Sequence, residues 1–265
     1  MDITARELEL FKLISYDGKY LGKTRLYGYG HDAGQKWEPD FGPEPEGVSV
    51  ILRNYIKALE FVKSYFPTYD KEQGFVFPNI IFSRQRKTRF YLYMETDDPE
   101  TISSMPVEEL VLGEYYASNN RIILFMDNIR ESAHDFSFAE TCMNTFVHEL
   151  FHAYHYWCIH YQGYTWDGKS PEKSEAVKEG LARAVEYQWS LQYFHGDEAN
   201  HPMRTYLEYN RYSNTPYKYA LVLMDSKDDV RFILDKYFSN WTQNAKAWGP
   251  AFKEIKRRYD YYLRK

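Results

Sequence analysis

The segment ETCMNTFVHELFHAYHYW contains the residues of this chain whose types and spacing are best suited to chemistry. His148 and His152 are four positions apart, so on a helix they project from the same face and can hold one metal ion between them. Glu149 is offset from His148 by about 100° around the helix, which places its carboxylate beside the metal rather than on it. A carboxylate there can take a proton from a metal-bound water, so the segment predicts metal-assisted hydrolysis.

The residues around the two histidines favour a metal site. They are mostly apolar, as in a helix buried at the centre of a domain: Thr145, Phe146, Val147, Leu150, Phe151 and Ala153. Burying two imidazoles and a carboxylate without partners costs several kcal/mol, and one metal ion would satisfy all three groups. The alternative is a helix with two partly buried, hydrogen-bonded histidines and no metal.

A catalytic zinc site needs a third protein ligand and leaves its fourth position to water. His155 follows His152 by three residues and shares its face, but this spacing makes it an awkward ligand for the same ion. The metzincin pattern HExxHxxGxxH requires a glycine at position 155 and a ligand at 158. Because His155 and Cys158 occupy these positions, that pattern is excluded, and a glutamate on a following helix is the remaining candidate.

A second helix is predicted at Pro171–Phe194, with proline at its first position and apolar residues at helical spacing. Glu175 and Glu179 are one turn apart on it, so either can be the third ligand. Gly180 costs about 1 kcal/mol relative to alanine in a helix interior, and we therefore expect another backbone to approach the helix there. The alternative is that both glutamates are exposed charges on an amphipathic helix.

The run KEGLARAVEY resembles the NEGFAxYxE segment of gluzincins of the M1-type aminopeptidases. The match covers Glu179, Gly180, Ala182 and Glu186, whereas Lys178 stands where the family has asparagine. In that family the first glutamate is the third zinc ligand. The resemblance thus implies that Glu179, rather than a residue of the first helix, completes the site.

A second segment, YSNTPYKYAL, resembles the Y-x-x-x-P-Y-x-K-G segment of the same family. There the tyrosine after the proline hydrogen-bonds the developing oxyanion, so the resemblance implies this role for Tyr217. The lysine and glycine that follow in the family are replaced by Tyr219 and Ala220. Altogether the resemblance covers about residues 121–240.

The predicted elements give an α+β fold class. We expect strands at 75–82, 88–94 and 121–126 and helices at 48–66, 138–161, 171–194, 201–212, 217–224, 228–240 and 246–264. The acidic, polar stretch 95–113 is predicted to be a loop with a short helical turn. The resemblance implies a zincin-like (thermolysin-like), two-lobed domain: an α/β lobe at 1–137 and a helical lobe carrying the metal site at 138–265, together one catalytic unit. In that resemblance the substrate lies along an edge strand, which we place at 121–126.

Composition argues against several other classes. The net charge of −5, without a basic block, gives no support to nucleic-acid binding, and no 18-residue apolar span is present for a membrane. The amino terminus does not resemble a signal peptide, so a cytoplasmic location is expected. Cys142 and Cys158 fall about 24 Å apart on one predicted helix, too far for a disulfide, and two free thiols fit a reducing compartment.

These features predict a zinc metallopeptidase that hydrolyses peptide or protein substrates. Zn²⁺ is expected to be bound by His148, His152 and Glu179. Glu149 is then the general base, and Tyr217 stabilises the oxyanion. Since no acidic site for a free amino terminus can be assigned, an endopeptidase or a peptidase of narrow range is favoured. The alternatives are a catalytically inactive zincin-fold binding or regulatory protein, which the departures from the family pattern favour, and a metal-free helical interaction domain.

Overall fold

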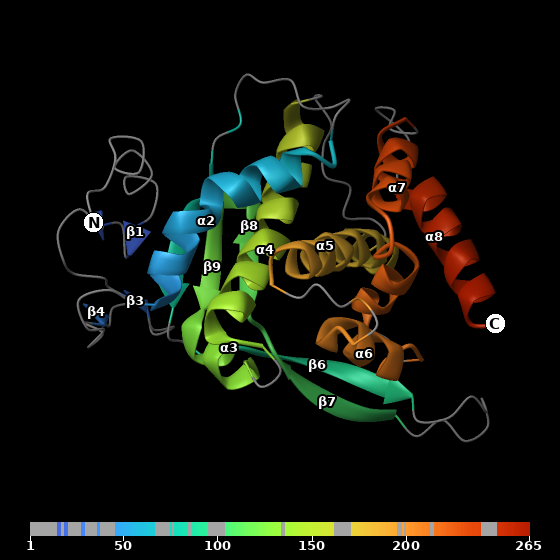
Figure 1. Cartoon of the computed structure of the whole chain (residues 1–265), viewed down its shortest axis with the longest axis horizontal. Coiled ribbons are helices and arrows are strands. Elements are labelled where there is room, and N and C mark those ends of the chain that lie inside the picture. The colour runs from blue at the N-terminus through green and yellow to red at the C-terminus, as the bar shows by residue number, and fades with distance from the viewer. Residues whose placement is uncertain are drawn as a thin grey trace. The chain divides into compact units, whose positions relative to one another are not determined.

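The computed structural model describes residues 15–16, 19–20, 28–29, 36–37, 46–66, 75, 77–83, 86–94, 104–133, 136–161, 171–194, 198, 200–212, 215–239 and 248–265. Within these residues the fold is mixed α/β, mostly helical, with a small three-stranded sheet (Figure 1). Two compact units are present. Unit 1 takes the described residues of 1–60, 72–89 and 110–153, and unit 2 those of 61–71, 90–109 and 154–265. The predicted division into lobes at residue 137 stays a prediction.

Most of the predicted helices and strands are present close to their predicted positions. They are α2 (Glu46–Lys63), β5 (Asn79–Ser83), β6 (Thr88–Met94), β9 (Arg121–Phe125), α4 (Phe138–Tyr161), α5 (Pro171–Tyr193), α6 (Pro202–Tyr209), η2 (Pro216–Val222), α7 (Lys227–Ser239) and α8 (Trp248–Tyr262). Of these, η2 is a 3₁₀ helix. Four two-residue strands form two short antiparallel ladders, β1 (Ser15–Tyr16) with β2 (Lys19–Tyr20) and β3 (Gly28–Tyr29) with β4 (Lys36–Trp37).

The predicted loop at 95–113 is wrong in part, because β7 (Ser104–Leu110) lies within it and pairs with β6. Pro106 and the acidic residues near it have low intrinsic strand propensity, so pairing with β6, rather than local sequence, accounts for this strand. Strand β8 (Gly113–Tyr116), the 3₁₀ turn η1 (Ala117–Asn119) and helix α3 (Met126–Ser132) were not predicted either.

In unit 1 the strand order of the three-stranded sheet is β5-β9-β8, with β5 parallel and β8 antiparallel to β9. The central strand is therefore β9, and the prediction that residues 121–126 form the edge strand is wrong. Its sequence, RIILF, is almost continuously apolar, and Ile122, Leu124 and Phe125 are buried. Among the described strands of this sheet, β5 and β8 are the two outer strands, and β8 follows β9 on the side opposite β5.

One face of this sheet carries α4, the helix with the two histidines. Partners across neighbouring strands project to the same face, so Phe82, Leu124 and Gly113 form one row. The atoms nearest to a Cβ built on Gly113 belong to the side chains of Thr145 and Glu149 on α4. The rings of Phe77 and Phe146 lie 6.3 Å apart and add to the contact between α4 and the start of β5. The sheet thereby supports the helix at the level of its histidines.

In unit 2, α5 packs closely against η2. The apolar positions of α5 that the sequence placed at helical spacing are buried: Val177, Leu181, Ala184 and Val185. A Cβ atom built on Gly180 would lie 3.1 Å from the Cβ of Tyr219 and 3.7 Å from the backbone nitrogen of Ala220. This confirms the predicted approach of a second backbone at Gly180, and the backbone is that of η2.

Cys142 and Cys158 both lie on α4 and are buried, and they do not form a disulfide with each other, as predicted. None of the helices in the described part of the chain combines the length and the apolar character needed to span a bilayer.

Candidate metal centre

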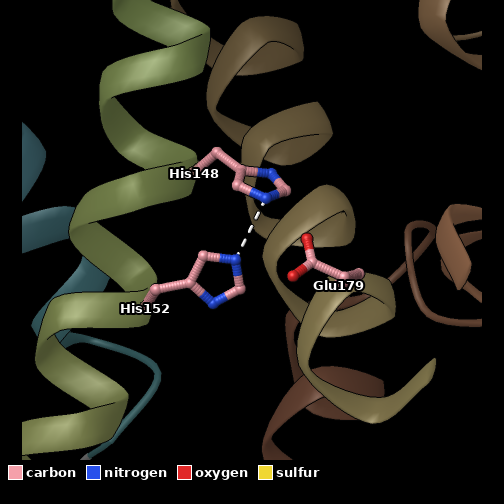
Figure 2. Close-up of side chains that lie close together, drawn as sticks. All are labelled: His148, His152 and Glu179. Atoms are coloured by element: carbon pink, nitrogen blue, oxygen red, sulfur yellow. Dashed lines mark hydrogen bonds between the residues drawn. The ribbon is translucent and has the colours of Figure 1, made fainter. Parts of the chain in front are cut away.

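The structure brings together the three side chains that the sequence proposed as metal ligands. One ligand atom from each of His148, His152 and Glu179 lies within 4.8 Å of the other two. The histidines project from α4 and the glutamate from α5, and the three side chains point toward one another (Figure 2). His148 is 6% exposed and Glu179 is 9% exposed, so both groups are largely withdrawn from water.

The spacing of the two imidazoles suits a shared metal ion. The Nε2 atoms of His148 and His152 are 3.1 Å apart. Two nitrogens that each lie 2.0–2.1 Å from a zinc ion at a tetrahedral angle are separated by about 3.3 Å. The donor set of two imidazoles and one carboxylate is also that of catalytic zinc sites. The residues present therefore have the chemical types of a zinc site, while the 3.1 Å separation of the two nitrogens is equally that of a hydrogen bond between the rings.

Glu149 lies on α4 where the helix meets the start of β8. It is 6% exposed. A Cβ atom built on Gly113 would lie 2.9 Å from the Cγ of Glu149 and 2.7 Å from the Cγ2 of Thr145, distances that real Cβ atoms essentially never show. Only a residue without a side chain lets β8 approach α4 this closely. Gly113, which the sequence reasoning missed, is therefore what makes room for the Glu149 carboxylate.

Replacing Gly113 with alanine is expected to destabilise the protein by about 1–3 kcal/mol, because the added methyl group overpacks the contact with Thr145 and Glu149. If Glu149 is the general base, its displacement should also lower kcat, by up to about 100-fold. Urea unfolding and steady-state kinetics at a fixed zinc content measure the two effects. Gly249→Ala is the matched control, since nothing lies within 4 Å of the added atom there. Wild-type stability and kcat in Gly113→Ala would contradict this packing.

The other candidate ligands on these helices lie elsewhere. The side chain of Glu175 is 45% exposed, and its Oε1 accepts a hydrogen bond of 2.8 Å from the Nζ of Lys178. The ring of His155 packs among aromatic side chains, with centroids 5.1 Å from Tyr237 and 5.8 Å from Phe238. The geometry thus favours Glu179 over Glu175 and places His155 in an aromatic cluster.

Tyr217 lies in η2, and its ring faces a charged group of α5. The Cζ atom of Arg183 is 4.5 Å from the centroid of the Tyr217 ring, and Nη1 of the same guanidinium donates a 2.9 Å hydrogen bond to Oε1 of Glu186. Burial lowers the pKa of Arg183 and the carboxylate of Glu186 raises it, with a net upward shift, so the group stays charged. Sequence reasoning missed Arg183. The available signal was its spacing, four residues after Glu179 on the same helical face.

Comparison with known proteins adds no further constraint: no protein-family model, no curated protein and no solved structure matches this chain.

Proposed function

We propose that this protein is a zinc-dependent peptidase of the gluzincin type. The observation that carries the proposal is the group formed by His148, His152 and Glu179, whose ligand atoms lie within 4.8 Å of one another. These three residues would hold the ion. When bound, zinc lowers the pKa of a coordinated water toward 7 and polarises a substrate carbonyl as a Lewis acid.

Glu149 is the general base in this proposal. It follows the first histidine on α4, and its carboxylate is held in a largely buried position against β8. It would accept the proton of the attacking water and pass it to the leaving amine. Tyr217 would donate a hydrogen bond to the oxyanion that develops on the carbonyl, a role supported by its segment's resemblance to the gluzincins and by the packing of η2 on α5.

The position of β8 supports a peptide as the substrate. As an outer strand of the described sheet, β8 can accept an extended chain as a further strand, with main-chain hydrogen bonds that do not depend on substrate sequence. Its first residue, Gly113, is packed against Glu149. A peptide that extended the sheet at β8 would therefore run beside the general base. This replaces β9, which we expected from the sequence to fill this role.

Cleavage of a peptide library by the protein with and without zinc tests the proposal. Mass spectrometry is expected to detect new peptide termini only with the zinc-loaded protein, and a chelator such as EDTA should remove the activity. Bound zinc is measured in the same samples by elemental analysis. One zinc per chain without any cleavage would instead support a binding protein of zincin fold. Absence of bound zinc would overturn the site itself.

Zinc is also expected to stabilise the folded chain, because the ligands are close together only in the folded state. At a free zinc concentration 100 times its Kd, the gain is about 2.7 kcal/mol and should raise the midpoint of thermal unfolding. His152→Ala is the control, since it removes one ligand and should abolish most of the shift. An equal shift in wild type and His152→Ala would locate zinc binding at other residues.

A further inference from the structure

The guanidinium of Arg183 is in contact with the tyrosine that the proposed mechanism uses. Arg183 lies one helical turn after Glu179 on α5, about 6 Å further along the axis and on the same face. Its Cζ is 4.5 Å from the centroid of the Tyr217 ring. This is well inside the separation of about 6 Å at which a cation is attracted to the face of an aromatic ring.

A second contact fixes the guanidinium itself. Nη1 of Arg183 donates to Oε1 of Glu186 over 2.9 Å, and the side chains of Arg183 and Glu186 are 18% and 6% exposed. Separating an ion pair this far withdrawn from water is unfavourable, because each charge would then be buried without a partner. The face of the guanidinium is thus held in one position on α5, and Tyr217 stacks on it.

The backbone of Tyr217 is anchored independently of its ring. The side chain of Thr215 caps the start of η2 by accepting a 3.4 Å hydrogen bond from the backbone nitrogen of Tyr217. Gly180 lets the following residues of η2 approach α5 closely. These contacts set the path of the chain, and the contact with Arg183 acts on the ring itself.

We infer that Arg183, clamped by Glu186, is a positioning residue for Tyr217. It holds the phenol ring at one place on α5, one turn beyond the ligand Glu179, and puts a positive charge beside a phenol that donates to an anionic oxygen. The inference rests on the proposed function, since it takes Tyr217 as the oxyanion donor. It concerns a residue for which the gluzincin resemblance implies no role.

The test variant is the pair Arg183→Met with Glu186→Gln, which removes the stacked cation without leaving a buried carboxylate unpaired. We expect kcat to fall by about 100-fold with little change in KM and with zinc content unchanged, because misplacing a catalytic group by about 1 Å costs that much. Arg183→Lys keeps the charge but not the planar face, so it should recover only part of the rate.

A double-mutant cycle separates positioning from general structural damage. In a Tyr217→Phe background, the Arg183→Met, Glu186→Gln pair should cause little further loss of kcat, because its effect is transmitted through the missing hydroxyl. Arg211→Met is the matched control: its guanidinium also stacks on a tyrosine, Tyr212, at 5.1 Å, and the rate should not change. The same fold-loss in the wild-type and Tyr217→Phe backgrounds would overturn the inference.

A readout without catalysis keeps this inference separate from the proposed function. With 3-fluorotyrosine at position 217, the ¹⁹F resonance should be shifted from that of the free amino acid. In the Arg183→Met, Glu186→Gln pair it should move toward the free value. If zinc-loaded wild type cleaves no peptide, the proposed function fails, yet this measurement still decides whether Arg183 holds the ring. An identical resonance in both proteins would overturn the inference.

Discussion

Replacing Glu149 with glutamine is expected to lower kcat by about 10²–10⁴-fold while one zinc ion remains bound per chain. Glutamine has the same size and fits the same space against Gly113 and Thr145, so the packing of α4 on β8 is retained. Its amide cannot accept the proton of the attacking water, and the loss of a general base costs a factor of that order. Steady-state kinetics on a cleaved peptide, with elemental analysis of zinc, measure both quantities.

Glu140→Gln is the matched control for this variant. Glu140 lies on the same helix and is similarly buried, with 4% exposure, but it stands near the start of α4, eight residues before His148. Its replacement should leave kcat unchanged. Full activity in Glu149→Gln would contradict the general-base role of Glu149. Loss of zinc from Glu149→Gln would mean that the carboxylate is a ligand.

Replacing Glu179 with alanine is expected to weaken zinc binding by at least about 100-fold. This carboxylate supplies one of the three ligand atoms that lie within 4.8 Å of one another. Loss even of an outer residue that orients a ligand commonly weakens metal binding by about 10–100-fold, so loss of a ligand should cost more. Competition with a chromophoric chelator measures the Kd. As metal occupancy falls, peptide cleavage should fall with it.

Glu175→Ala is the matched control, because Glu175 is the other glutamate of α5 that the sequence offered as a zinc ligand. The side chain of Glu175 is 45% exposed and paired with Lys178, and an ion pair open to water on one side contributes little to stability. Its replacement should leave the zinc Kd within a factor of about two, because no ligand is lost. If Glu175→Ala weakened zinc binding more than Glu179→Ala, the assignment of the third ligand would be reversed.

Where the candidate site depends on local spacing, the sequence was sufficient to predict it. The four-residue separation of His148 and His152 places both imidazoles on one face of any helix, and the structure brings their nitrogens to 3.1 Å. The bounds of α4 could be read from the sequence for the same reason, since they follow the helical run of apolar residues. Gly180 was also informative, because a helix-interior glycine is costly unless a neighbour needs the space.

Contacts between segments distant in the chain could not be predicted in this way. Strand β8 is four residues long and has no clear alternation, and its pairing with β9 made the expected edge strand a central one. Gly113 acquires its role only because that pairing carries it to Glu149 on α4. Local periodicity contains no information on which strand becomes a neighbour, so this part of the site depends on long-range packing.

The sequence by itself determined the chemical types of the site: two imidazoles and a carboxylate on one helix, and glutamates one turn apart on the next. Only the tertiary structure decided which of the two glutamates lies near the histidines, and which residues surround Glu175 and His155. Glu175 and Glu179 lie one turn apart on the same helix. Of the two, it is Glu179 that has a carboxylate oxygen within 4.8 Å of a ring nitrogen of each histidine. His155 packs against Tyr237, more than eighty residues away in the chain. Helical spacing fixes which side chains share a face, whereas the packing of that face on distant segments fixes what each side chain meets.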